Sequence, residues 1–181
     1  MNNLPFIDCN AERTEFSDEC YGALGRALYV TQHLEANCRA LAILMDVKKT
    51  ITIGDIGSPD DPEFIEFVSK LWNRSLGKNL DVLRTYGFPE EVYSSLHEAR
   101  KARNEVAHAI TLGIEHKLEE NLGRKEILDD IATAVKHIAE GDRIIGFLMQ
   151  CVTNEPCPSS SYLHDYPDKV VEWVCETFDS P

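Results

Sequence analysis

The chain has 181 residues and a formal net charge of −13, and 43% of its residues are hydrophobic. This composition suits one folded domain, or a domain with a small appendage, and excludes a chain that is disordered throughout. The acidic charge argues against a general nucleic-acid coat, because such proteins bind phosphates through long basic stripes. A local basic site stays open, since Arg100, Lys101 and Arg103 form the densest positive cluster.

The sequence carries no sign of a membrane span, a secretion signal or a disulfide framework. No apolar run reaches the length of a transmembrane helix, and Met1–Phe6 lacks the basic and apolar regions of a signal peptide. We therefore expect a cytoplasmic protein without membrane contact. Its six cysteines are widely spaced, which predicts free thiols. Cys151, Cys157 and His164 lack zinc-ligand spacing, and we expect neither a metal nor another cofactor.

The first half of the chain predicts an arm and a long helix. Residues 1–16 are polar and without periodicity, as in a flexible arm. Apolar residues then recur on one helical side from Ser17, a plausible N-cap, to about Asp46. Residues 47–61 are rich in glycine, proline and aspartate and predict a turn-rich connection, within which the alternation of Thr50–Ile53 would also suit a short strand.

Three further amphipathic helices follow. The segment Asp61-Pro62-Glu63 predicts an N-cap with proline at the first helical position. The second helix continues to Tyr86, with Gly77 as an interruption, and a third runs from Pro89 to about Ile114. The charged segment 115–124 precedes the fourth helix, Lys125 to Thr153.

The end of the chain predicts a linker and a short helix. Residues 154–166 are rich in proline and serine. Residues 165–178 suit a last helix with apolar side chains available to dock, namely Val170, Val171, Val174 and Phe178. We therefore expect an all-α fold, with an antiparallel four-helix bundle over 17–153 and a linker with a short C-terminal helix over 154–181.

Arg103 stands where the third helix should be apolar. At 100° per residue it lies about 20° from the centre of a stripe formed by other residues, Leu96, Ala99, Val106 and Ile110. An arginine is buried only when it is paired, because its charge cannot be shed. We expect an acidic partner, either Glu35 on the apolar side of the first helix or Asp142 at the edge of the fourth, or else a polar cleft.

Arg103 is followed by Asn104 and, after three more residues, by His108. Histidine transfers protons near neutral pH, and guanidinium binds phosphate oxygens in pairs. Asn104 would orient the histidine or bind an oxygen. In an α-helix His108 would point about 140° away from Arg103, so a plain surface histidine and a structural arginine remain alternatives.

Three neighbours are candidate substrate-binding residues. His97 and Arg100 lie on the flank of Asn104, and Lys101 follows them. They would line an RNA groove or form a solvated helix face.

This motif, placed late in a four-helix chain, resembles the HEPN superfamily (higher eukaryotes and prokaryotes nucleotide-binding). The stretch from Ser75-Leu76-Gly77-Lys78 to Leu96 is similar to that of bacterial members. The resemblance implies a metal-independent endoribonuclease that cleaves RNA as a homodimer, with Arg103, Asn104 and His108 from two subunits facing one cleft. It also implies a role in toxin–antitoxin or antiviral systems, with an antitoxin or regulatory protein as partner.

The chain departs from one branch of the family. Toxin members often carry a tyrosine two residues after the histidine, where this chain has Ile110. This puts in doubt membership of the type whose tyrosine is modified by its antitoxin. A non-catalytic HEPN-like binding or regulatory module, and a plain helical dimer with a structural arginine, are the alternatives.

Overall fold

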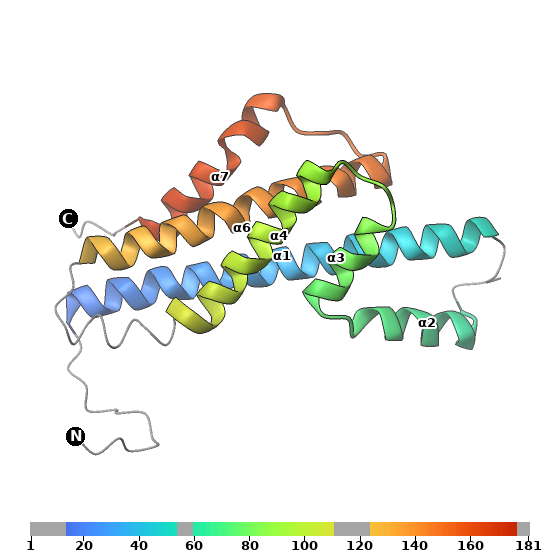
Figure 1. Ribbon diagram of the computed structural model, residues 1–181, viewed down its shortest axis with the longest axis horizontal. Coiled ribbons are helices and arrows are strands. Elements are labelled where there is room, and N and C mark those ends of the chain that lie inside the picture. Colours follow the sequence, from blue (N-terminus) through green and yellow to red (C-terminus); the bar gives the residue numbers. More distant parts are fainter. Residues whose placement is uncertain (1–13, 54–59, 111–123, 177–181) are drawn as a thin grey trace, which may run out of the picture.

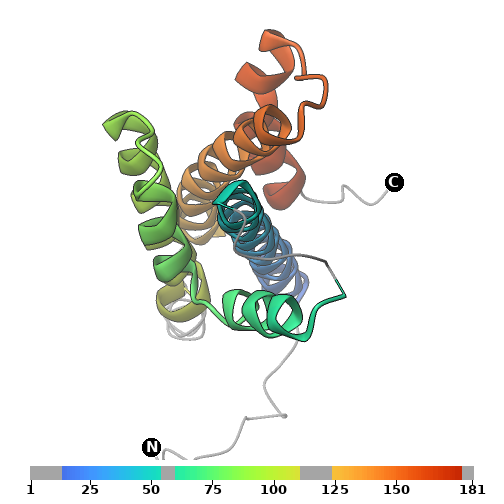
Figure 2. The same cartoon turned by 90° about the vertical axis from the view of Figure 1, so that its right-hand side faces the viewer.

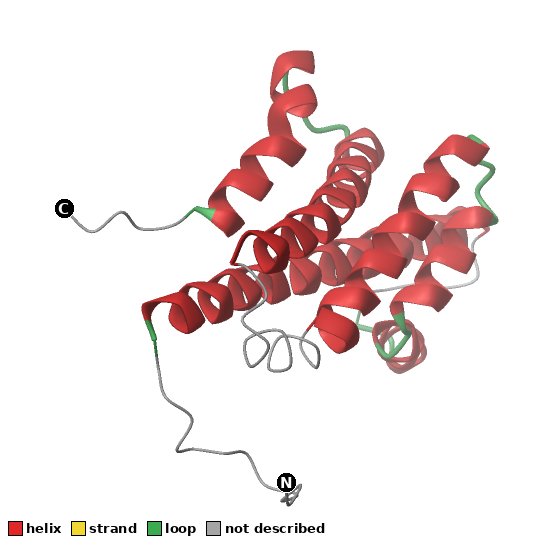
Figure 3. Cartoon of the chain, turned by 60° about the vertical axis from the view of Figure 1, so that its left-hand side comes forward, coloured by secondary structure: helices red, strands yellow, loops and turns green. Residues whose placement is uncertain are grey.

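The computed structural model describes residues 14–53, 60–110 and 124–176, and these residues form helices and no strand (Figures 1 and 3). The all-α class predicted from the sequence is confirmed. The elements are α1 (Glu15–Ile53), α2 (Pro62–Trp72), α3 (Leu76–Arg84), α4 (Glu90–Asn104), the π-helical segment η1 (Glu105–Ile110), α6 (Arg124–Thr153) and α7 (Ser160–Cys175). In this part of the chain, no helix combines the length and the apolar character needed to cross a membrane.

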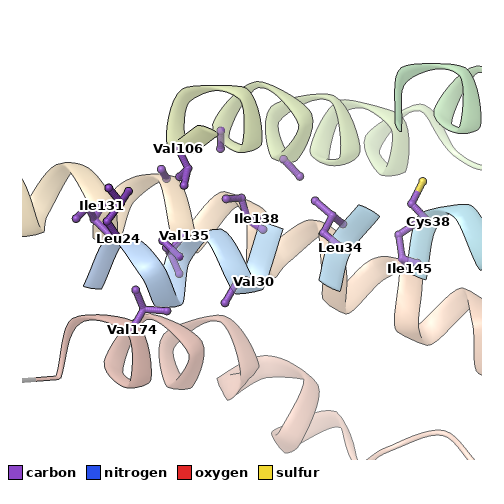
Figure 4. Close-up of a cluster of buried hydrophobic side chains, with 14 of the residues drawn as sticks. Leu24, Val30, Leu34, Cys38, Val106, Ile131, Val135, Ile138, Ile145 and Val174 are labelled. Carbon is purple, nitrogen blue, oxygen red and sulfur yellow. The ribbon is translucent and has the colours of Figure 1, made fainter. Parts of the chain in front are cut away.

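The long helices α1 and α6 lie side by side at the centre, with α4 on one side and α7 on the other (Figures 1 and 2). The shared core is aliphatic. Figure 4 shows Val106 entering it from the α4–η1 side and Val174 from the α7 side. Both of these valines are fully buried. The helices around this core bury their apolar faces against one another, and this burial is the main stabilising term of such a fold.

The two central helices run parallel, which corrects the prediction of a purely antiparallel bundle. Asn37 of α1 contacts Asp142 of α6, and further along both helices Lys48 donates to the carbonyl of Val152. The α6–α7 pair is antiparallel (Figure 1). Helical periodicity marks the buried face of a helix but carries no information about its direction, so the sequence could not show this.

The first helix is longer than predicted and the expected turn begins later. Residues 47–53 are helical, so the short strand considered for Thr50–Ile53 is wrong. The Thr50 hydroxyl donates to the carbonyl of Asp46 at 2.9 Å, a bond that lets a β-branched residue remain in a helix. Asp46 also binds Arg74 at 2.6 Å and the Tyr86 hydroxyl at 2.9 Å, which ties this end of α1 to the chain around α3.

The second predicted helix is two helices. Its start is confirmed, since Asp61 caps α2 by accepting from the Glu63 N–H at 3.0 Å, with proline at the first position. The break falls at residues 73–75 rather than at Gly77, because Ser75 caps α3 and accepts from the Lys78 N–H at 3.4 Å.

The last helix begins at Ser160, earlier than predicted, and only residues 154–159 connect it to α6. Val174 belongs to the buried core, and the predicted docking of Val170 and Val171 against that core is also observed. Arg26 of α1 donates to the carbonyls of Val174 at 2.9 Å and Glu176 at 3.3 Å, where the helix dipole favours a cation.

The first helix begins at Glu15, so the last two residues of the predicted arm 1–16 are helical. Thr14, which accepts from the Ser17 N–H at 3.1 Å, takes the capping role predicted for Ser17. Residues 1–13 of that arm, the end of the third helix beyond Ile110 and Phe178 lie outside the described residues.

A close helix crossing places α4. A Cβ built on Gly141 of α6 would lie 2.4 Å from the Cβ of Ala99. Ala99 itself is buried, so α4 rests on the bare backbone of α6 at this point. Arg103 lies one turn further along α4 and contacts Glu35 of α1.

Candidate functional site around Arg103

Arg103 is half-buried and paired with an acidic residue, as the sequence predicted. Its Nε donates to Glu35 Oε1 of α1, and its Nη1 donates to Asn104 Oδ1 at 3.0 Å. The Arg103 and Glu35 side chains are 27% and 22% exposed. Arg103 therefore stands at the edge of the core stripe, and Ala102 and Val106 on either side of it are buried.

Asp142, the other predicted partner of Arg103, belongs to a different network. Its carboxylate accepts from the Tyr166 hydroxyl at 2.6 Å and from Asn37 Nδ2 at 3.0 Å, and it lies 3.1 Å from His33 Nδ1. Burial and the neighbouring carboxylate raise the pKa of Tyr166 above its ordinary value. Asp142 thus joins α1, α6 and α7, and Glu35 is the carboxylate that supports Arg103.

His108 lies on η1 and is exposed. A π-helix closes hydrogen bonds five residues apart rather than four, so each turn holds more residues. His108 is the fifth residue after Arg103, and the wider turn brings it closer to the Arg103 side than the about 140° of an ideal α-helix. The segment keeps its contact with the interior, because Val106 is buried and Ile110 packs against the core.

The imidazole of His108 forms no hydrogen bond or ion pair within the described part of the chain. Arg103 and Asn104 are joined by a hydrogen bond, but no such bond joins either of them to His108. The three predicted catalytic residues are thus neighbours on one helical path, with His108 open to solvent.

Two of the three predicted substrate-binding residues share a groove between α3 and α4. His97 and Arg100 line this groove, whose volume is about 530 Å³, and Arg100 Nη2 lies 3.5 Å from His97 Nδ1. Lys101 does not line it and instead pairs with Glu98 at 2.8 Å. Neither Arg103 nor His108 is among the residues that line this groove.

The groove also holds residues that sequence reasoning did not single out. Arg84 lies over the ring of Tyr93 at 5.9 Å and pairs with Glu90 at 3.1 Å. These residues come from α3 and the start of α4, and their approach depends on the break before α3. No pattern in the sequence marks that break with enough precision to find them.

The described cysteines are all free thiols, namely Cys20, Cys38, Cys151, Cys157 and Cys175. Burial, with a contribution from Glu35, raises the pKa of the Cys38 thiol to about 12, which suits a packing role rather than a reactive one. Among residues 14–53, 60–110 and 124–176, no three histidine, cysteine or acidic side chains come together in a group that would hold a metal ion.

Comparisons of the chain with family models, with curated proteins and with solved structures found no match.

Proposed function

We propose that the protein is a cytoplasmic, metal-independent endoribonuclease of the HEPN type that works as a homodimer in a toxin–antitoxin or phage-defence system. In this proposal α1, α2 with α3, α4 with η1, and α6 are the four helical units of a HEPN-like bundle over residues 17–153. The observation that supports it most is the fixed guanidinium of Arg103, held by Glu35 and Asn104, with the exposed His108 five residues further along the same helical path.

The contacts of Arg103 leave donors for a phosphate. A guanidinium has five N–H donors, of which Glu35 and Asn104 engage one on Nε and one on Nη1. No hydrogen bond to Nη2 is formed by the residues that the structure describes. Glu35 restrains the side chain before substrate arrives, which lowers the entropic cost of aiming the free edge at a phosphate.

The reaction needs two proton transfers and stabilisation of the phosphate. In the proposal, the 2′-oxygen of the RNA attacks phosphorus and loses its proton, while the 5′-oxygen leaves and gains one. His108 carries one of these transfers, worth roughly 10²–10⁴-fold in rate. The two-fold partner supplies a second set of the same residues, and the products are a 2′,3′-cyclic phosphate and a 5′-hydroxyl.

The test is cleavage of mixed RNA in EDTA, followed by end-group analysis. Arg103→Ala and His108→Ala should each lower the cleavage rate by at least about 100-fold. His137→Ala is the matched control, because His137 is a half-exposed histidine on α6 whose neighbour is Glu140 at 3.7 Å. Circular dichroism and size-exclusion chromatography would confirm that each variant keeps its fold and oligomeric state.

Two outcomes contradict the proposal. Cleavage that persists in both variants would mean that another site, or a contaminant, is responsible. Cleavage that requires a divalent ion would contradict the metal-independent mechanism. Because Arg103→Ala also removes the partner of Glu35, Arg103→Lys serves as a second variant that keeps the charge but loses the two-pronged geometry.

The alternative is a non-catalytic HEPN-like binding or regulatory module. It is favoured by one observation, that the α3–α4 groove holds His97 and Arg100 but neither Arg103 nor His108. In this case the protein would bind single-stranded RNA without cutting it. Arg100→Ala would reduce the salt dependence of binding by about 0.7 in the log–log slope for one lost phosphate contact, and His108→Ala would leave it unchanged.

A further inference from the structure

A second pocket lies between α1 and α7, on residues separate from Arg103 and His108. It has a volume of about 260 Å³ and is lined by Tyr29, Val30 and His33 of α1 and by Tyr166, Val170 and Trp173 of α7. Four of these six side chains are aromatic rings, and none is a lysine or an arginine. The volume lies just below the usual range of about 300–1,000 Å³ for small-molecule sites, so it suits a head group rather than a nucleotide.

The aromatic side chains form an open wall. The Tyr29 ring stacks on His33 with centroids 6.5 Å apart, and Trp173 meets Tyr29 edge-on at 6.1 Å. Tyr29 is 61% exposed and Trp173 is 48% exposed, so the wall is accessible to a ligand. The faces of such rings carry negative potential, which attracts cations.

A buried carboxylate stands behind this wall. Asp142 is 5% exposed, and it is held by Tyr166 and His33, which both line the pocket, and by Asn37. Donation from the Tyr166 hydroxyl to Asp142 at 2.6 Å shifts electron density into the Tyr166 ring. Within the described residues, no lysine or arginine is among the partners of Asp142, so no permanent cation neutralises it there.

The nearest basic side chain along α1 is engaged elsewhere. Arg26 is one turn before Tyr29 and donates to the carbonyls of Val174 and Glu176 at the end of α7. Its charge is therefore directed at the negative end of a helix dipole. The pocket itself combines aromatic faces and a nearby buried acid, and neither a lysine nor an arginine lines it.

We propose that this pocket binds a small organic cation, an alkylated ammonium group of the choline or trimethyllysine kind. The rings of Tyr29, Tyr166 and Trp173 would surround the alkylated nitrogen, and Asp142 would supply long-range attraction through the low-dielectric interior. This inference is independent of the proposed ribonuclease activity, because it uses none of the residues to which that activity assigns a catalytic or RNA-binding role.

The test uses the fluorescence of Trp173. The chain has two tryptophans, so Trp72→Phe leaves Trp173 as the single reporter. In this background, choline should produce a saturable change in emission. Tyr29→Leu should weaken binding by about tenfold, as the loss of one cation–π contact predicts, and Tyr29→Phe should keep binding within about threefold because the ring remains.

The control variant is Tyr21→Leu. Tyr21 is on α1, like Tyr29, and is 45% exposed, but it does not line the pocket. Choline affinity should be unchanged in this variant. Asp142→Asn should weaken binding while keeping the shape of the side chain. Should Asp142→Asn fail to fold by circular dichroism, the Tyr29 variants decide alone.

Three results would overturn the proposal. The first is no binding of choline to the intact chain, and the second is equal affinity for 3,3-dimethyl-1-butanol, the neutral isostere of choline, which would indicate a plain apolar pocket. The third comes from titrating free choline and trimethyllysine beside phosphatidylcholine vesicles: saturation by the free cations supports the proposal, and binding confined to vesicles overturns it in favour of a lipid surface.

Discussion

Replacing Gly141 by alanine tests how closely α4 packs on α6. The added Cβ would lie 2.4 Å from the Cβ of Ala99. Two carbon atoms normally approach to about 3.5–4.0 Å, so the helices would have to separate by about 1 Å or more. Overpacking of this kind costs roughly 1–3 kcal/mol, against a gain of about 0.8–1 kcal/mol in helix propensity. We expect Gly141→Ala to lower the free energy of unfolding.

The same helix provides the control. A Cβ on Gly146 would meet nothing within 4 Å, so Gly146→Ala should gain the propensity term and raise the free energy of unfolding by about 0.5–1 kcal/mol. Urea unfolding followed by circular dichroism measures both variants. The double variant Gly141→Ala with Ala99→Gly should recover stability, since it removes the opposing methyl group. Equal stability of Gly141→Ala and Gly146→Ala would refute the close crossing.

Two further perturbations test the outer helix and the far end of α1. Arg26→Ala should remove two hydrogen bonds to the end of α7, at a cost of about 1–2 kcal/mol, and hydrogen exchange of residues 160–175 should then speed up more than that of α6. The pKa of Tyr86 is raised from 10.0 to about 12 by burial and by Asp46, so the neutral phenol is favoured in the folded state. Its contribution to stability is complete below pH 10 and is lost as pH rises through about 12. Urea unfolding between these pH values should show a smaller loss for Tyr86→Phe, and an unchanged loss would contradict this role.

Local signals in the sequence are sufficient for most helices and for the pairing of Arg103. Asp61 followed by proline marks the start of α2 because capping is a local interaction. The position of Arg103 in an apolar stripe predicts an acidic partner or a polar cleft, and Glu35 is one of the two acids considered as that partner. The choice between Glu35 and Asp142 needs the arrangement of the helices. The apolar stripe alone does not show whether Arg103 faces the first helix, which carries Glu35, or the fourth, which carries Asp142.

Long-range contacts and backbone variants are beyond the sequence. The His33 side chain is 49% exposed, as expected for a surface histidine, but it also contacts Asp142, which is 109 residues away and which no pattern in the sequence marks as its partner. The break at residues 73–75 is set by Ser75, which caps α3. In the sequence, Gly77 is a second signal for a break only two residues later, and the pattern alone does not choose between them. The η1 segment is a π-helix, a rare variant that occurs mostly as a single turn within an α-helix, so the periodicity of an α-helix does not indicate it.

The π-helical segment lets a spacing of five residues keep His108 closer to the Arg103 side. Deleting one residue between Arg103 and His108 would allow the segment to return to α-helical hydrogen bonding. Four residues of an α-helix turn through about 400°, which would leave the histidine about 40° from Arg103, whereas five would turn it about 140° away. A one-residue deletion would therefore keep the histidine on the Arg103 side. Proteins with the shorter spacing in an α-helix and proteins with the longer spacing in a π-helical turn would thus present the histidine on the same side.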